Sequence, residues 1–174
     1  MHTHKVGSSL VTAGEKGESM KRLFGVLAGM LAACALVPAA SSAAGPVAAT
    51  GGGRGTTDGV HAFSDFGFSV MRSTGGAVEG HFNCLMAGSS QFPGFTLMAV
   101  RGQVTHATMG GSTASFDGVG MFLAPGVFDK SAATFHVEVT AGGPGVGTLH
   151  LTLLTPFLFD LPVEHVLHGQ ISID

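Results

Sequence analysis

The chain has 174 residues and a formal net charge of −3, and 11% of its residues are charged. Its hydrophobic content of 45% excludes an intrinsically disordered chain, and the acidic balance argues against nucleic-acid binding through phosphate contacts. Two cysteines cannot form a cysteine-rich zinc module or a disulfide framework.

The N-terminal region has the order of a secretory signal peptide. Met20 is followed by two basic residues, and an uncharged run rich in Ala and Leu spans 23–37, directly before Pro38. This run is shorter than the roughly 20 apolar residues that a membrane helix needs. We therefore expect 20–44 to be a signal peptide cleaved after Ala44. The protein is then exported, either secreted or held in the periplasm or cell envelope.

Two other interpretations of this region stay open. One is a lipoprotein box that ends at Cys34, which would then carry a lipid, and the other is an uncleaved membrane anchor. Residues 1–19 are polar and precede a good start at Met20, so we interpret them as an upstream extension from an incorrectly assigned start codon. These boundaries leave 45–174 as a single domain, for which we expect no integral membrane segment.

From residue 45 onward, apolar and polar residues alternate with the period of half-buried β-strands. Glycine- and proline-containing turns separate the alternating segments, and 141–145 is the clearest hairpin loop. With a short strand near 48–52, we predict about eight strands, joined mostly as neighbours in an antiparallel meander. The glycine-rich stretch 51–55 is interpreted as a flexible start of the mature chain.

Glycines at inward positions of the predicted strands indicate that the strands are strongly coiled. They are Gly80, Gly102, Gly118, Gly120 and Gly169. Because coiled strands close on themselves, we predict an all-β fold with a single antiparallel β-barrel of about eight strands. A two-sheet β-sandwich is the alternative. The segment 155–163 breaks the alternation and is predicted to be a long loop over one end of the barrel.

Seven histidines follow residue 44, and this enrichment raises the question of a metal site or a general base. His136 and His150 lie on opposite arms of the 141–145 hairpin, where cross-strand pairing would place His150 opposite His136 or Glu138. Glu138 is the candidate for a third metal ligand. We nevertheless expect no metal and no other cofactor, and we interpret the histidines as scattered surface residues.

Polar residues that point into the barrel are the candidates for binding a ligand or substrate. Parity predicts that His165 points inward beside Glu164, and an enzyme would need His165, His81 or Asp65 to line a cavity. Cys84 also has inward parity, so we predict a buried thiol rather than a nucleophile. No catalytic residue can be named from these patterns.

Glycine–aromatic motifs occur in a characteristic order along the chain, at Thr50–Gly53, Phe66–Phe68, Val78–Cys84 and Val100–Val104. They resemble a loose family of exported bacterial proteins of unknown function. The resemblance implies a single all-β domain after a signal peptide. It implies no activity, substrate or catalytic residue.

No nucleophile elbow or phosphate loop occurs in the sequence. We therefore expect an exported, non-enzymatic binding or envelope-associated domain whose partner is an unknown small molecule or protein. One alternative is a small-barrel enzyme of isomerase or cyclase type that acts in a lined cavity, and another is a structural or interaction protein. The barrel interior distinguishes these three functions. A polar cavity favours a ligand-binding domain or an enzyme, and a solid apolar core favours an interaction module.

Overall fold

The structure is a computed structural model that describes residues 45–87 and 97–174, and these residues form strands without a helix. Neighbouring strands are antiparallel, and each strand from β1 to β6 pairs with the next one in the chain. The strands are β1 (Val47–Thr56), β2 (Ser64–Arg72), β3 (Val78–Ala87), β4 (Leu97–Gly110), β5 (Thr113–Ala124), β6 (Phe128–Thr140), β7 (Thr148–Thr155), β8 (Phe159–Asp160) and β9 (Glu164–Ile173).

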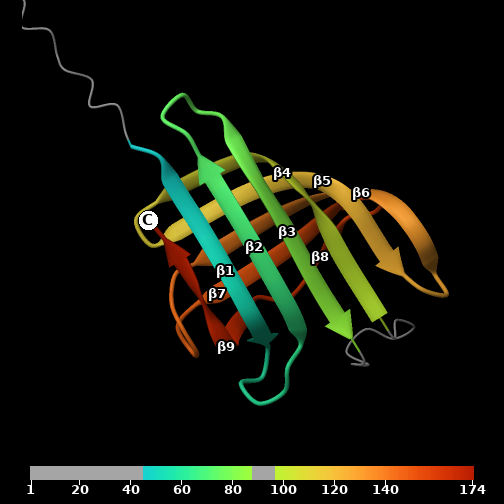
Figure 1. The fold of residues 1–174 in the computed structure, drawn as a ribbon. Coiled ribbons are helices and arrows are strands. Elements are labelled where there is room, and N and C mark those ends of the chain that lie inside the picture. Colours follow the sequence, from blue (N-terminus) through green and yellow to red (C-terminus); the bar gives the residue numbers. More distant parts are fainter. Residues whose placement is uncertain (1–44, 88–96) are drawn as a thin grey trace, which may run out of the picture. The chain divides into compact units, whose positions relative to one another are not determined.

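The last long strand, β9, closes the sheet into a barrel-like ring (Figure 1). It pairs with β1 along most of its length and with the start of β7 at Glu164 and His165. Eight strands form the ring, and the two-residue strand β8 pairs with β7 next to it. The prediction of an all-β antiparallel barrel of about eight strands is therefore confirmed over the two-sheet alternative.

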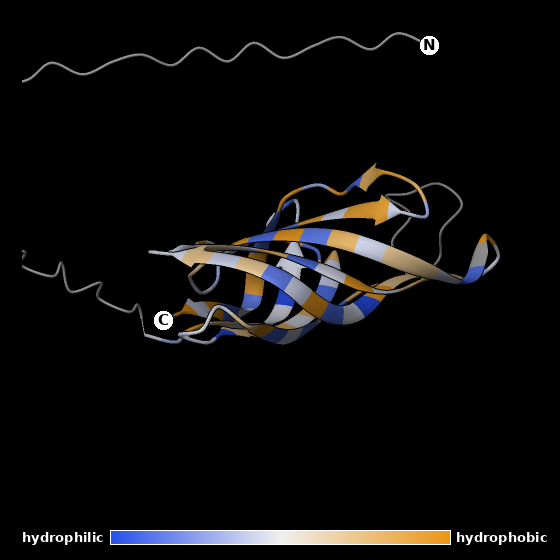
Figure 2. Cartoon of the chain, turned by 90° about the horizontal axis from the view of Figure 1, so that it is seen from above, coloured by the Kyte–Doolittle hydropathy of each residue, from blue (hydrophilic) through white to orange (hydrophobic). Residues whose placement is uncertain are grey.

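Alternate side chains of each strand fill the ring with an apolar core, and Figure 2 shows the corresponding hydrophobic and hydrophilic bands along the strands. Four phenylalanine rings are packed in a chain through the core. The ring centroids are 5.3 Å apart for Phe68 and Phe116, 5.8 Å for Phe82 and Phe116, and 5.2 Å for Phe82 and Phe135. These are favourable aromatic contacts, and they fill the centre of the ring with apolar side chains.

Facing glycines let the backbones of β4 and β5 approach closely. Gly102 pairs with Gly120, and a side chain on either residue would collide with the backbone of the opposite strand. On the same face, the ring of Phe135 occupies the place of a side chain at Gly118. The predicted role of these inward glycines in strand coiling is supported by these contacts.

The β6–β7 hairpin has the predicted facing. One face of the hairpin is buried and the other carries polar residues, as alternation requires. The buried residues are Phe135, Val137, Val139, Leu149, Leu151 and Leu153. The residues on the outer face are Thr134, His136, Glu138, Thr148, His150 and Thr152.

A bulge in β9 reverses the expected alternation in its first half. Arg54 of β1 pairs with His168, whereas the next residue, Gly55, pairs with Val166, so Leu167 has no partner on β1. An extra residue of this kind shifts every side chain before it to the other face. Gly169, beside the bulge, has a φ of 95°, which glycine adopts without strain.

Because of this bulge, one expectation about the interior of the ring was wrong. His165 was predicted to point inward, but it is exposed on the outer face, and its neighbour Glu164 is buried instead. The reason is that parity counted from the end of β9 fails once Leu167 is inserted in the strand.

Of two further expectations about irregular segments, one was wrong and the other was incomplete. Residues 51–55 are not a flexible start, because they lie within β1 and pair with both β2 and β9. The segment 155–163 is not only a loop, because it contains β8. Within this segment, Phe157 packs edge-on against Phe122, with centroids 5.6 Å apart, and Leu161 is buried.

The predictions for the upstream extension 1–19, the signal peptide 20–44, cleavage after Ala44 and lipidation of Cys34 lie outside the described residues. In 45–87 and 97–174, no helix has the length and apolar character that crossing a membrane requires.

Candidate functional site

The outer face of β4–β8 carries rows of polar side chains that cross the strands. Their residues come from distant parts of the chain, and the antiparallel register aligns them. One row contains Thr108, Ser115, Glu138 and His150. The neighbouring row contains His106, Asp117, His136, Thr152 and Asp160.

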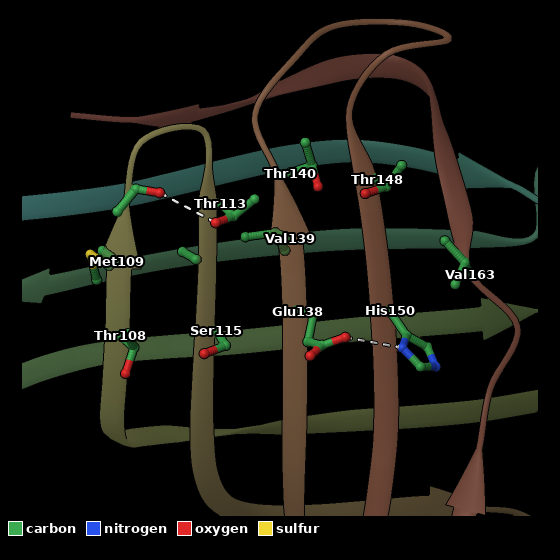
Figure 3. A pocket seen from close by; sticks show the side chains of 12 residues that line it. Thr108, Met109, Thr113, Ser115, Glu138, Val139, Thr140, Thr148, His150 and Val163 are labelled. Carbon is green, nitrogen blue, oxygen red and sulfur yellow. Dashed lines mark hydrogen bonds and ion pairs between the residues drawn. The ribbon is translucent and has the colours of Figure 1, made fainter.

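A hollow of about 520 Å³ lies on this face, over the row from Thr108 to His150 (Figure 3). Its polar lining consists mainly of hydroxyl groups, together with the Glu138 carboxylate and the His150 imidazole. The hydroxyls belong to Thr108, Thr113, Ser115, Thr140 and Thr148. Most of these groups can both donate and accept hydrogen bonds, and Met109, Val139 and Val163 supply apolar lining, so the hollow is suited to a molecule with both polar and apolar surface.

Five side chains beside and below the hollow form what we call the imidazole–carboxylate chain: Asp117, His136, Glu138, His150 and Asp160. Asp117 Oδ1 lies 2.7 Å from Nδ1 of His136, and Nε2 of the same ring lies 3.7 Å from Glu138 Oε1. Glu138 Oε2 lies 3.5 Å from Nδ1 of His150, whose Nε2 lies 2.9 Å from Asp160 Oδ1. Each imidazole is therefore flanked by two carboxylates.

This arrangement is poorly suited to nucleophilic catalysis. In a hydrolase triad, one imidazole nitrogen faces a carboxylate and the other accepts a proton from a hydroxyl or thiol. Here both nitrogens of His136 and of His150 face carboxylates. Neither ring is aimed at a hydroxyl nucleophile.

Hydrogen bonds fix the carboxylate of Asp160 at the end of the chain. Thr152 Oγ1 donates to Asp160 Oδ1 over 2.7 Å. This hydrogen bond, together with the nearby His150, holds the pKa of Asp160 below its ordinary value. His150 therefore keeps an anionic partner under mildly acidic conditions.

The three candidate metal ligands come together, since Glu138 lies directly opposite His150 and also near His136. This is one of the two pairings that the hairpin allowed. Among the residues that the structure describes, no group of three or more His, Cys, Asp or Glu side chains is placed to hold a metal ion. We assign no metal to these residues.

The other predicted site residues lie apart from this chain. Asp65 is exposed on β2, where its Oδ1 lies 3.1 Å from Nε of Arg54. His81 is exposed on β3, beside a second hollow of about 410 Å³ that also contacts Arg101 and Met121. His165 lies opposite Thr148 at the edge of the polar face. None of these three lines the interior.

A buried carboxyl group, which the sequence analysis did not find, lies inside the ring. Glu164 is 2% exposed and accepts a hydrogen bond from Ser64 Oγ, and Gly55 lies against its carboxylate. Burial raises the pKa of Glu164 to about 7. Correct parity would have identified this residue, but the bulge in β9 concealed it.

The predicted buried thiol of Cys84 is confirmed, since this residue is 2% exposed. Burial, and to a lesser degree the nearby charge of Glu164, raises the pKa of the thiol. A nucleophilic cysteine needs the opposite shift. Cys84 is therefore a packing residue.

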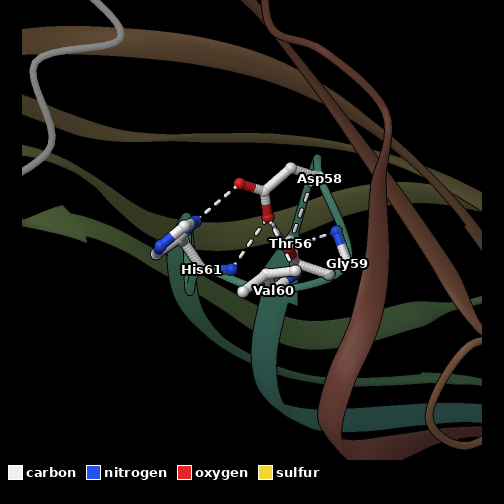
Figure 4. A network of polar contacts seen from close by, with 5 residues as sticks. All are labelled: Thr56, Asp58, Gly59, Val60 and His61. Atoms are coloured by element: carbon white, nitrogen blue, oxygen red, sulfur yellow. Dashed lines mark hydrogen bonds and ion pairs between the residues drawn. The ribbon is translucent and has the colours of Figure 1, made fainter.

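A polar network orders the β1–β2 loop around Asp58 (Figure 4). Asp58 Oδ1 accepts hydrogen bonds from the backbone N–H groups of Val60 and His61, each 2.8 Å long, and one from Thr56 Oγ1. Its Oδ2 lies 2.8 Å from Nδ1 of His61. These hydrogen bonds from His61, Val60 and Thr56 hold the pKa of Asp58 well below its usual range. Such a network orders a turn. We therefore interpret Asp58 and His61 as residues that hold the conformation of this loop.

Comparison of the chain with protein-family models, curated proteins and solved structures gave no match. The resemblance of the sequence motifs to exported bacterial proteins therefore stays a prediction.

Proposed function

We propose that the protein is an exported, non-enzymatic binding domain that takes a polar ligand in the hollow on the outer face of β4–β7. The observation that carries the proposal is the distribution of polar groups. Hydroxyls, a carboxylate and an imidazole converge on a hollow of about 520 Å³ outside the ring. Recognition sites commonly combine a concave surface with a few convergent polar groups.

The interior of the ring supports binding through the outer surface. Phe68, Phe82, Phe116 and Phe135 are packed against one another in the core. A small-barrel enzyme would instead need a lined cavity inside the ring. The outward positions of His165, His81 and Asp65 also disfavour that alternative.

The lining indicates the general chemistry of the ligand. Glu138 is an acceptor when ionised, and the surrounding Ser and Thr hydroxyls can donate or accept. A small molecule with several hydroxyl or amino groups would satisfy this set. The proposed export from the cell is supported by the signal-peptide pattern at 20–44.

Amide chemical-shift mapping with defined probes tests the proposal. The probes are mono- and disaccharides, amino sugars and free amino acids, each added to the labelled domain. We expect at least one probe class to shift signals of Thr108, Ser115 and Thr140. We expect Ser115→Phe, which fills the hollow, to abolish the effect. Ser69→Phe, at an exposed outward position of β2, is the matched control and should keep it.

The opposite result would contradict the proposal. If every probe left the face unchanged, or if the shifts mapped to inward residues of the ring, binding in this hollow would be wrong. If Ser69→Phe abolished binding as completely as Ser115→Phe, the hollow would not be the site.

A further inference from the structure

The imidazole–carboxylate chain offers more acceptors than neutral imidazoles can satisfy. A neutral imidazole has one N–H donor and one acceptor nitrogen, whereas an imidazolium donates from both nitrogens. His136 and His150 each face a carboxylate oxygen with both nitrogens. In the neutral state, therefore, one nitrogen lone pair of each ring faces a negative oxygen. Protonation converts both of these unfavourable contacts into ion pairs.

Protonation also changes how many strands the chain connects. Its residues lie on four elements, with Asp117 on β5, His136 and Glu138 on β6, His150 on β7 and Asp160 on β8. With both rings charged, donors and acceptors alternate without interruption from β5 to β8. The two end contacts, at 2.7 and 2.9 Å, then become charge-assisted hydrogen bonds, which are stronger than neutral ones, and the two central contacts, at 3.7 and 3.5 Å, become ion pairs.

Glu138 couples this change to the hollow. Its carboxylate lines the hollow, as does His150 (Figure 3). When both imidazoles are charged, His136 faces one of its oxygens and His150 faces the other. Each oxygen of Glu138 is then paired with a cationic ring, so the carboxylate is a weaker acceptor for a molecule in the hollow than it is beside neutral rings.

We propose that the imidazole–carboxylate chain is a proton-operated switch: protonation of His136 and His150 ties β5 to β8 and withdraws Glu138 from the hollow. The switching of the chain does not depend on a ligand. The regulatory role of the switch rests on the proposed function. Protonation of the two rings makes the hollow a poorer hydrogen-bond acceptor under mildly acidic conditions than at neutral pH. Histidine is the side chain suited to a charge change in this range.

The charged and titratable groups around the chain are consistent with this switch. On β4, His106 lies opposite Asp117, and on β9, His165 lies opposite Thr148. The strand segments 105–110, 113–117, 134–140 and 148–155 contain no Lys or Arg. Within the chain itself, three carboxylates face two imidazoles, so its charge changes from −3 to −1 when both rings are protonated.

A double-mutant cycle at two pH values tests the switch without a ligand. The cycle uses His150→Gln and Asp160→Asn, with unfolding measured in urea at pH 7.5 and at pH 5.5. We expect the coupling free energy between the two residues to be at least twofold larger at pH 5.5. The buried Glu164 responds to pH in all four proteins alike, so its contribution cancels in the cycle.

Arg54 and Asp65 provide the matched control cycle. They form an exposed ion pair with Nε and Oδ1 3.1 Å apart, and arginine does not titrate in this range. Their coupling should be the same at both pH values. Equal coupling of His150 and Asp160 at pH 7.5 and 5.5 would overturn the proposed switch.

The state of Glu138 is read separately from its side-chain carboxyl ¹³C signal. We expect acidification from pH 7.5 to 5.5 to shift this signal in the native sequence, and we expect a His136→Gln/His150→Gln variant to lose most of the shift. An unchanged response in that variant would disprove the withdrawal of Glu138. Neither measurement uses a ligand, so a failure of probe binding and a failure of the switch are distinguished.

Discussion

Ser64 donates a hydrogen bond to the buried carboxyl group of Glu164, although the two residues are 100 positions apart in the chain. Ser64 begins β2 and Glu164 begins β9, so the bond connects the two strands that flank β1. Both side chains are almost completely buried. A carboxyl group in this position couples the stability of the ring to pH.

Glu164 is expected to make the domain more stable in mild acid. Burial raises the pKa of Glu164 from 4.5 to about 7, so the folded state holds the proton more tightly than the unfolded state. The stabilisation of the folded state by protonated Glu164 is fully present below pH 4.5 and is lost as the pH rises through 7. Each pH unit between the two values corresponds to about 1.4 kcal/mol, which gives a total of about 3 kcal/mol.

Urea unfolding of the native sequence and of Glu164→Gln at pH 5 and pH 8 measures this effect. Glutamine keeps an acceptor for Ser64 but does not titrate. The variant should lose most of the pH dependence and should gain stability relative to the native sequence at pH 8. A variant with the full native pH dependence would show that other groups cause it.

Gly55→Ala is expected to destabilise the domain by about 1–3 kcal/mol, the usual cost of overpacking. A methyl group at this position would collide with the Glu164 carboxylate. Gly52→Ala is the control on the same strand, because its methyl group would meet its nearest neighbour, the Phe66 carbonyl oxygen, at an ordinary 3.8 Å. Thermal unfolding of both variants compares them, and equal losses would mean that crowding at Glu164 is unimportant.

Leu151→Ala is expected to lower the free energy of unfolding by about 2–5 kcal/mol, since it empties a core position. Leu151 is 1% exposed, whereas Leu154 on the same strand is 43% exposed. Leu154→Ala should therefore cost less than about 0.5 kcal/mol. Denaturant titration measures both changes. A small loss for Leu151→Ala would contradict the inward facing of β7.

Cys84 is expected to react slowly with Ellman's reagent in the native state. The thiol is buried and its pKa is raised by burial, so little thiolate reaches the reagent. A Cys34→Ser background leaves Cys84 as the single thiol. Full labelling in denaturant is the control, and rapid labelling at neutral pH without denaturant would show that the thiol is accessible.

The hairpin of β6 and β7 shows how far local alternation predicts the fold. A short loop fixes its register, so the facing of Val137 and Leu151 follows from sequence parity alone. The same reasoning failed in β9, where Leu167 is an extra residue. Alternation carries no direct sign of such a bulge, and Gly169 was compatible with both an inward position and a bulge.

The candidate site was predictable only where one hairpin contains it. Glu138 opposite His150 was one of the two pairings expected for β6 and β7. Asp117 comes from β5, whose pairings with β4 and β6 both contain register shifts. Asp160 comes from the two-residue strand β8, which the alternation did not predict. A register shift such as the one between Phe122 and Ala124 of β5 is not visible in the alternation, so the complete imidazole–carboxylate chain could not be derived from sequence.

Closure of the ring by β9 has a consequence for self-association. Each long strand that the structure describes is paired on both sides over part of its length, and segments such as 104–110 of β4 and 128–133 of β6 are paired on one side only. Strand-by-strand addition, which drives edge aggregation and many sheet-built filaments, needs a long row of unpaired backbone groups. Strand-by-strand assembly of this domain with copies of itself would therefore be restricted to these short segments, because none of the described long strands has one side unpaired along its whole length.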